Sequence, residues 1–217
     1  MTKNIKIKFS NVYLNLVSAY TIAGIQHLEH YVNEIEQKFE ADLQKIEYPD
    51  ISEIKLFEDE VIEDYFPDEF KVIENVFKYR FRYSIITSLY TLLEVSINQL
   101  CDHLKKYEKL PISYRELRGD GIQRAKNYLC KMCAITEPFN RKEWADIQTL
   151  NLLRNCIVHA DGNIEQTKSP DKLKNRIKVT NHISGNSELH IDKEYLLFII
   201  NSSIEFLEQI YSEAKKL

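Results

Sequence analysis

The sequence predicts an all-α protein, an up-and-down bundle of helices with one small β-hairpin before the last helix. Three observations support this prediction. The 217 residues include only five glycines and five prolines, the residues that most often interrupt helices. Apolar residues recur three or four positions apart over most of the chain, which is typical of helices with a buried face. The apolar period shortens to two only near the C-terminus, as in strands.

The N-terminal part of the chain differs in composition from the rest. Its apolar residues, among them Val12, Leu16, Leu28 and Val32, fall mostly three or four positions apart and predict a helix over 11–46, which Pro49 should end. We therefore interpret residues 1–50 as a long N-terminal helix, 51–66 as an acidic connection and 67–217 as the helical bundle itself. A single domain over the whole chain is the alternative, because 217 residues suit one domain.

Proline, glycine and capping residues divide the bundle into elements. Pro67 is suited to the first turn of a helix that runs to about Tyr107. Asn140 and Glu143 have the spacing of an N-cap and its partner, and Gly162 can end the helix that they begin. The expected elements are helices over 67–107, 121–135, 141–160 and 193–214, with a hairpin within 175–192.

The predicted hairpin depends on alternation around a turn. Ile177 and Val179 alternate with polar residues, and Leu189 and Ile191 do so again. The sequence "SGNS" between the two pairs is typical of a tight turn. We therefore expect two antiparallel strands directly before the last helix.

Charge and apolar runs limit the function classes. The net charge of −4 does not indicate a nucleic-acid binder, although a local cleft on an acidic protein can still be basic. No segment reaches the ~18 consecutive apolar residues of a membrane span, and the N-terminus lacks the apolar core of a signal peptide. Cys130 and Cys133 lie within a helix without further zinc ligands, so we interpret them as packing residues. We expect a cytoplasmic protein with reduced thiols and no membrane association.

The helix over 141–160 is apolar on nearly all sides but carries one narrow polar seam. The seam consists of Gln148, Asn151, Asn155 and His159, spaced three or four residues apart. An unpaired amide or imidazole inside a protein costs about 1–3 kcal/mol, so the seam should face a polar cleft or a partner subunit. A second seam on 84–102 should line the same cleft; it comprises Ser84, Ser88, Thr91, Glu94, Asn98 and Asp102.

Arg154 lies on the same helix but outside the seam. At about 100° per residue, it points roughly 140° away from His159. One helix does not easily direct both side chains at one atom, whereas two helices related by a two-fold axis can. The geometry thus favours a homodimeric site. An Arg–His pair at such spacing is nevertheless common by chance and recurs at Arg176 and His182, so spacing alone does not establish chemistry.

The segment "LLRNCIVHADG", residues 152–162, resembles the signature of the HEPN superfamily, the all-helical domains of prokaryotic toxins and defence nucleases. Arg154, Asn155 and His159 match its pattern of Arg, a polar residue, a few further residues and His on a late helix. Glu94 is similar to an acidic residue that these domains often carry on an earlier helix. The resemblance covers about residues 70–215.

This resemblance implies a metal-independent endoribonuclease with a composite active site at a homodimer interface, in a toxin–antitoxin or phage-defence system. The RNA 2′-OH would attack the adjacent phosphorus and leave 2′,3′-cyclic phosphate and 5′-OH ends. His159 would transfer protons and Arg154 would stabilise phosphate charge. Asn155 would orient His159 or the partner chain, and Glu94 would hold Arg154 or His159. No cofactor and no metal are expected; an antitoxin or sensor protein is a further candidate partner.

Four basic residues outside this motif are candidates for binding the RNA backbone. Arg80 extends the polar seam of the second helix, and the others lie in the basic stretch 168–178 after His159; they are Lys172, Lys174 and Arg176. A solvated loop is an equally good interpretation of that stretch. Two alternatives to catalysis also stay open: a non-catalytic HEPN-like dimer that binds RNA, a nucleotide or a partner protein, and a scaffold whose polar seam only fixes dimer register.

Overall fold

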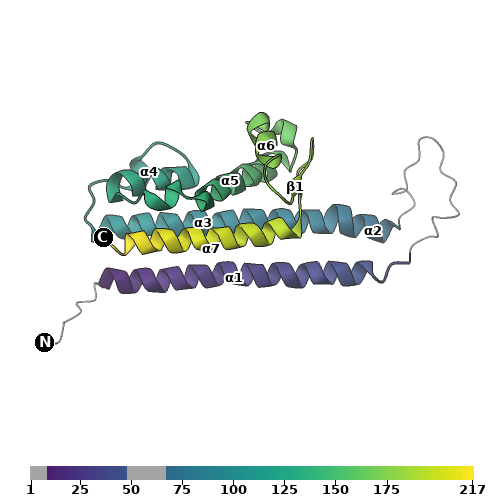
Figure 1. Ribbon diagram of the computed structural model, residues 1–217, viewed down its shortest axis with the longest axis horizontal. Helices are drawn as coiled ribbons and strands as arrows, with labels where there is room; N and C mark the ends of the chain where they lie inside the picture. Colours follow the sequence, from purple (N-terminus) through teal and green to yellow (C-terminus); the bar gives the residue numbers. More distant parts are fainter. Residues whose placement is uncertain (1–8, 48–66) are drawn as a thin grey trace.

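The computed structural model describes residues 9–47 and 67–217, so the acidic connection at 51–66 and the expected stop at Pro49 lie outside the described residues (Figure 1). Within them the predicted all-α class is confirmed, with a short hairpin before the last helix. The α-helices are α1 (Phe9–Leu43), α2 (Asp68–Val72), α3 (Tyr79–Tyr107), α4 (Gly121–Cys133), α5 (Lys142–Ala160), α6 (Pro170–Ile177) and α7 (Lys193–Ala214). The two antiparallel strands are β1 (Ile183–Ser184) and β2 (His190–Ile191).

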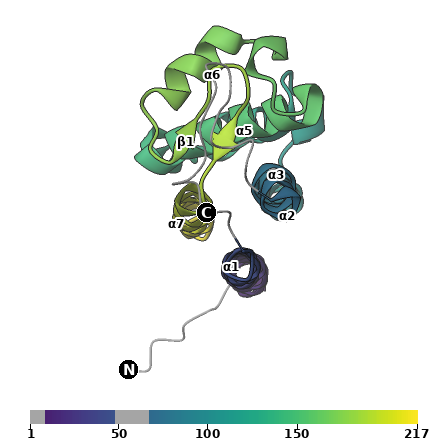
Figure 2. The same cartoon turned by 90° about the vertical axis from the view of Figure 1, so that its right-hand side faces the viewer.

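The helices form three layers. α3 and α7 lie side by side in the middle, α1 covers one side of them, and α4 and α5 cover the other (Figure 2). α6 and the hairpin lie at the end of α5 (Figure 1). The side chain of Asn11, near the start of α1, donates to the carbonyl of Lys215 just after α7, so α1 runs antiparallel to α7.

The core lies between these layers. It includes aliphatic side chains of α3, α5 and α7. An aromatic group lies where α5 meets α7. Trp144 stacks on Phe206 with ring centroids 5.5 Å apart, and Phe139 packs edge-on against both rings. Burial of each such large side chain stabilises the fold by about 1.5–3 kcal/mol. The core therefore fixes α5, which carries the candidate motif, against α7.

The predicted apolar face of α1 is correct in its second half and wrong in its first. Val32 is buried as expected, but Leu16 is 67% exposed and Val12 41% exposed, whereas Leu14 and Ile25 are buried. Apolar residues surround this part of the helix, so its spacing is compatible with more than one orientation. The packing of α1 against α3 and α7 selects the face that carries Leu14 and Ile25.

The ends of α5 differ from the prediction in their capping. Asn140 ends a 3₁₀ turn (Glu137–Asn140), and Arg141 occupies the N-cap position without a side-chain capping hydrogen bond. At the other end Asp161, and not glycine alone, adopts the left-handed conformation with φ +49°. The N–H of Gly162 then donates to the carbonyl of Cys156 at 3.2 Å, which closes the end of the helix.

The hairpin is shorter than predicted. Ile177 ends α6 instead of starting a strand, and Val179 is 75% exposed. The helix was missed although Pro170 and Asp171 are good first-turn residues. Leu173 and Ile177, four residues apart, are both buried and hold α6 against the fold. Strand pairing is limited to two residues on each side of the turn.

Candidate functional site

An open pocket of about 560 Å³ lies between α3, α5 and the segment that leads into α6. All four residues predicted to be catalytic line it. The full set of lining residues is Tyr90, Glu94, Asp120, Gly121, Asn151, Leu152, Arg154, Asn155, Cys156, His159, Gln166, Thr167, Lys168, Ser169 and Leu173.

The two polar seams meet in this pocket over a short length only. α5 contributes Asn151, Asn155 and His159 as predicted, but α3 contributes Glu94 alone from its seam. The remaining seam residues of α3 do not line the pocket, and neither does Gln148. About one turn of α3, from Tyr90 to Glu94, and about two turns of α5, from Asn151 to His159, reach the pocket.

Arg154 is held on two sides. Its Nη1 donates to Oδ1 of Asn155 at 3.0 Å, and Nδ2 of Asn155 donates in turn to Oδ1 of Asn151 at 3.3 Å. The guanidinium carbon lies 5.3 Å from the centroid of the Tyr90 ring, within the range of a cation–π contact. Nε of Arg154 is buried and has no hydrogen-bond partner in the described part of the chain. A ligand with acceptor oxygens could therefore supply the contact that this side chain lacks.

His159 is exposed and lines the same pocket as Arg154. Both residues thus line one pocket from a single helix, although about 140° separates their positions on it. The cause is the length of the arginine side chain, which turns toward Asn155 and Tyr90 and so offsets the angle between the two positions. The expectation that a second copy brings the two side chains to one atom stays a prediction. Over residues 9–47 and 67–217, the structure gives the imidazole of His159 no hydrogen bond, so it is accessible to a ligand.

Glu94 does not hold Arg154 or His159 as predicted. No ion pair or hydrogen bond joins it to either residue within the described ranges. Its carboxylate instead lies near the start of α4, where a Cβ added to Gly121 would be 3.1 Å from Oε1. Burial and then the charge of Glu94 raise the pKa of the Tyr90 hydroxyl, and the nearby backbone N–H of Ile122 opposes part of that rise. Tyr90 is therefore a neutral phenol that supports Arg154.

Cys156 is the one thiol that lines the pocket. Burial raises its pKa to about 11, so it is protonated at neutral pH. A protonated thiol is a poor nucleophile. The chemistry of the pocket therefore depends on the imidazole and the guanidinium rather than on a cysteine.

The four predicted RNA-binding residues do not line the pocket. Arg80 forms a two-pronged ion pair with Asp161, with Nη2 donating to Oδ2 at 3.0 Å, and Lys174 pairs with Glu165. Arg176 faces Asp146 closely enough to oppose the rise in the pKa of that carboxyl, which burial causes. Lys172 is exposed on α6.

The sequence prediction missed two lining residues that matter for the site. Lys168 contributes a positive charge at the rim, although only its neighbours in the basic stretch were selected as candidates. Tyr90 lies four residues before Glu94, and this helical spacing was the one signal that could have identified it. Both residues depend on the tertiary fold for their place in the pocket.

Neither membrane spans nor similar proteins give a second line of functional evidence. No helix in the described part of the chain has the length and apolar character needed to cross a membrane. The pocket itself therefore carries the functional argument, because no family model, no curated protein and no solved structure matches this chain.

Proposed function

We propose that this chain is a cytoplasmic, metal-independent endoribonuclease that acts as a homodimer in a toxin–antitoxin or phage-defence system. One observation carries the proposal: a single open pocket collects Arg154, Asn155 and His159, together with Glu94 from another helix. These are the residues on which the resemblance to HEPN domains was based. Imidazole and guanidinium groups together can cleave RNA without a metal ion.

The mechanism follows from the chemistry of the two groups. One imidazole removes the proton of the RNA 2′-OH or protonates the departing 5′-oxygen, since imidazole exchanges protons near neutral pH. The guanidinium of Arg154 stabilises the negative charge that grows on the phosphate oxygens during attack. Asn155 acts as a positioning residue, because it accepts a hydrogen bond from Arg154 at 3.0 Å. The products are a 2′,3′-cyclic phosphate and a 5′-OH end.

A second copy of the chain fits the exposed face beside the pocket. Val158, directly before His159, is 46% exposed, and Val95 of α3 is 48% exposed. Both residues directly adjoin pocket residues in the sequence, so a partner that covers them would also face the pocket. A partner there would supply a second imidazole, so that one could act as base and the other as acid.

The test is cleavage of total RNA by the purified protein in EDTA. We expect the wild type to cleave, and His159→Ala and Arg154→Ala to lose at least about a hundredfold in rate. His30→Ala and Arg118→Ala are matched controls, since both side chains are exposed and neither lines the pocket. Circular dichroism melting should show all four variants folded.

Three outcomes would contradict the proposal: no cleavage by the wild type, cleavage that needs a divalent ion, or variants that cleave as well as the wild type. RNA that is bound by the wild type but never cleaved would instead support a non-catalytic dimer.

A further inference from the structure

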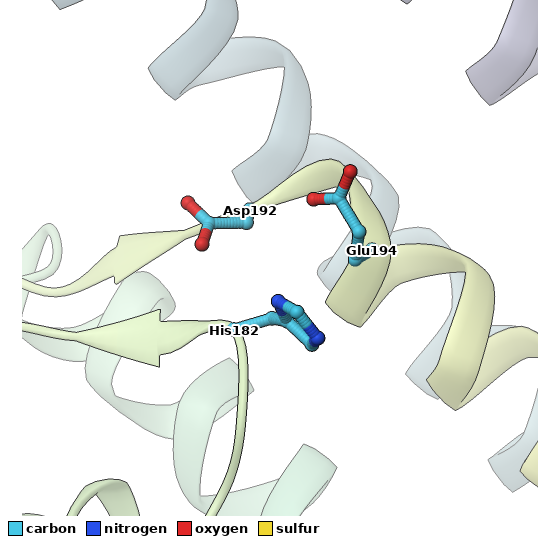
Figure 3. Close-up of side chains that lie close together, drawn as sticks. All are labelled: His182, Asp192 and Glu194. Carbon is cyan, nitrogen blue, oxygen red and sulfur yellow. The ribbon is translucent and has the colours of Figure 1, made fainter.

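A cluster of metal-binding side chains lies where the hairpin meets α7, outside the pocket. His182 precedes β1, Asp192 follows β2, and Glu194 lies in the first turn of α7 (Figure 3). We propose that these three residues form a divalent metal site, for which Zn²⁺ is the best-suited ion. The site is independent of the proposed cleavage chemistry, since none of the three lines the pocket.

The ligand atoms are close enough to share one ion after small side-chain rotations. One imidazole nitrogen and one oxygen from each carboxylate all lie within 4.8 Å of one another. Two ligands of a tetrahedral zinc ion, at about 2.1 Å from it, are about 3.4 Å apart. All three side chains are exposed, so each can rotate until its ligand atom reaches the ion, without displacing the core.

The backbone under this cluster is well fixed. The N–H of Asp192 donates to the carbonyl of His182 at 3.0 Å, and the next residues inward, Ile183 and Ile191, pair across the hairpin. The N–H of Tyr195 donates to the carbonyl of Asp192 at 3.2 Å, which ties the cluster to α7. A metal site gains affinity when its ligands are held in place before binding.

None of the three side chains makes a hydrogen bond or an ion pair with another residue in the described part of the chain. Asp192 occupies the N-cap position of α7 but makes no side-chain capping hydrogen bond. His182 adopts φ +62°. One nitrogen of its imidazole lies within 4.8 Å of an oxygen of each carboxylate (Figure 3). The three ligands are therefore available to an ion rather than committed to the fold.

The donor set also selects among ions. Two carboxylates provide the charge that a divalent cation needs, and the imidazole favours Zn²⁺ over Mg²⁺ and Ca²⁺, which prefer oxygen alone. Arg82 is near enough to Asp192 to interact with its charge, but its guanidinium is paired with Glu36. The positive end of α7 further weakens cation binding. These opposing charges predict moderate rather than tight affinity.

The test is calorimetric titration of the full chain with ZnCl₂ and, separately, MgCl₂, combined with thermal melting. We expect one saturable zinc site, no magnesium binding at the same concentrations, and a rise in Tm of about 5 °C with saturating zinc. His182→Asn and Glu194→Gln should each weaken zinc binding by more than about tenfold. Asparagine tolerates positive φ, so the first variant keeps the backbone.

The control is His30→Ala, an exposed histidine on α1 that should leave zinc binding unchanged. The proposal is overturned if zinc shows no saturable binding below about 1 mM, or if the two variants bind it as well as the wild type. EDTA separates the two proposals, because it should abolish the zinc-dependent rise in Tm and leave RNA cleavage unaffected.

Discussion

Arg154 shows how a single side chain in the pocket is positioned. Asn155 accepts its hydrogen bond on one side and the ring of Tyr90 lies against it on the other. This arrangement leaves the guanidinium in one orientation before any ligand binds, and electrostatic stabilisation by fixed groups needs little reorganisation during a reaction. The contact with Tyr90 can therefore be tested separately from the catalytic groups.

Replacing Tyr90 by Leu should lower the cleavage rate about tenfold, because the cation–π contact that orients Arg154 is lost. Tyr90→Phe keeps the ring and should retain most of the activity, although it loses the hydroxyl near the start of α4. Single-turnover cleavage and thermal melting distinguish the two effects. Equal losses of activity in both variants would show that the hydroxyl, and not the ring, is what matters.

Gly162 is required by the turn that follows α5. It adopts φ +84°, and an added Cβ would collide with the hydroxyls of Tyr83 and Tyr79. Those hydroxyls are fixed, since that of Tyr83 also donates to the carbonyl of Leu189 at 2.7 Å. Gly162→Ala should therefore destabilise the protein by about 2 kcal/mol or more, measured by urea unfolding.

The matched control is Gly24→Ala within α1. A Cβ there would meet no atom within 4 Å, so the variant should stabilise the helix by about 0.5–1 kcal/mol. Equal effects of the two substitutions would contradict this account of the turn.

The site residues could be predicted from the sequence only where local spacing identifies them. Arg154, Asn155 and His159 lie within six residues of one helix, so their pattern is visible without a fold. Tyr90 and Lys168 come from segments distant in the chain, and only packing of α3 and the turn before α6 brings them to α5. Within the described residues the structure joins Glu94 to neither Arg154 nor His159, and its carboxylate lies near the start of α4.

A buried ion pair joins the first helix to the bundle. Nε and Nη2 of Arg82 donate to the two carboxylate oxygens of Glu36 at 2.7 and 2.8 Å, and Nη1 donates to the carbonyl of Ile191 at 3.0 Å. Glu36 is only 2% exposed. This one contact thus connects α1, α3 and the hairpin. It helps to orient α1, whose buried face was not determined by the spacing of its apolar residues.

Removing one partner of this pair should be costly. Glu36→Ala leaves the cation of Arg82 half-buried without a counter-charge, so we expect a loss of about 3 kcal/mol, the lower end of the range for buried pairs. The double substitution Glu36→Leu with Arg82→Met should lose less than Glu36→Ala alone. Denaturant unfolding of the three proteins checks this, and a double variant less stable than the single one would contradict it.

Helices could be predicted well where their ends carry turn chemistry and one apolar face. α4, α5 and α7 follow their predicted ranges to within a few residues. The predicted helix over 67–107 consists of α2, a π-helical segment (Ile73–Lys78) and α3. α6 was missed because eight residues offer too few repeats to distinguish a period of four from a period of two. The first half of α1 was misoriented because neighbours, and not its own residues, decide which apolar side is buried.

In the molecule as a whole, α5 and α6 lie on the side of α3 and α7 opposite α1 (Figure 2), and residues of α3, α5 and the start of α6 line the pocket. The proposed dimer packs through the exposed Val158, which directly precedes the pocket residue His159. Val158→Asp should therefore produce a monomer and lower cleavage by more than about tenfold, because a charge would be buried at the interface. Val179→Asp, which alters a residue that is 75% exposed, is the control.

Light scattering with size-exclusion chromatography measures the oligomeric state of both variants. A wild-type protein that is monomeric yet fully active would contradict the dimer and leave the cleavage chemistry intact, so the two parts of the proposal can fail separately.

In the proposed function, the pocket cleaves RNA by attack of the ribose 2′-OH on the adjacent phosphorus. The most direct test is one defined oligonucleotide, cleaved in EDTA, compared with the same oligonucleotide carrying a 2′-deoxy sugar at the cleaved position. We expect the ribose oligonucleotide to yield a 2′,3′-cyclic phosphate and a 5′-OH end. We expect no cleavage of the 2′-deoxy oligonucleotide at that position. Cleavage of the deoxy substrate at the same position, or ends with a 5′-phosphate, would contradict it.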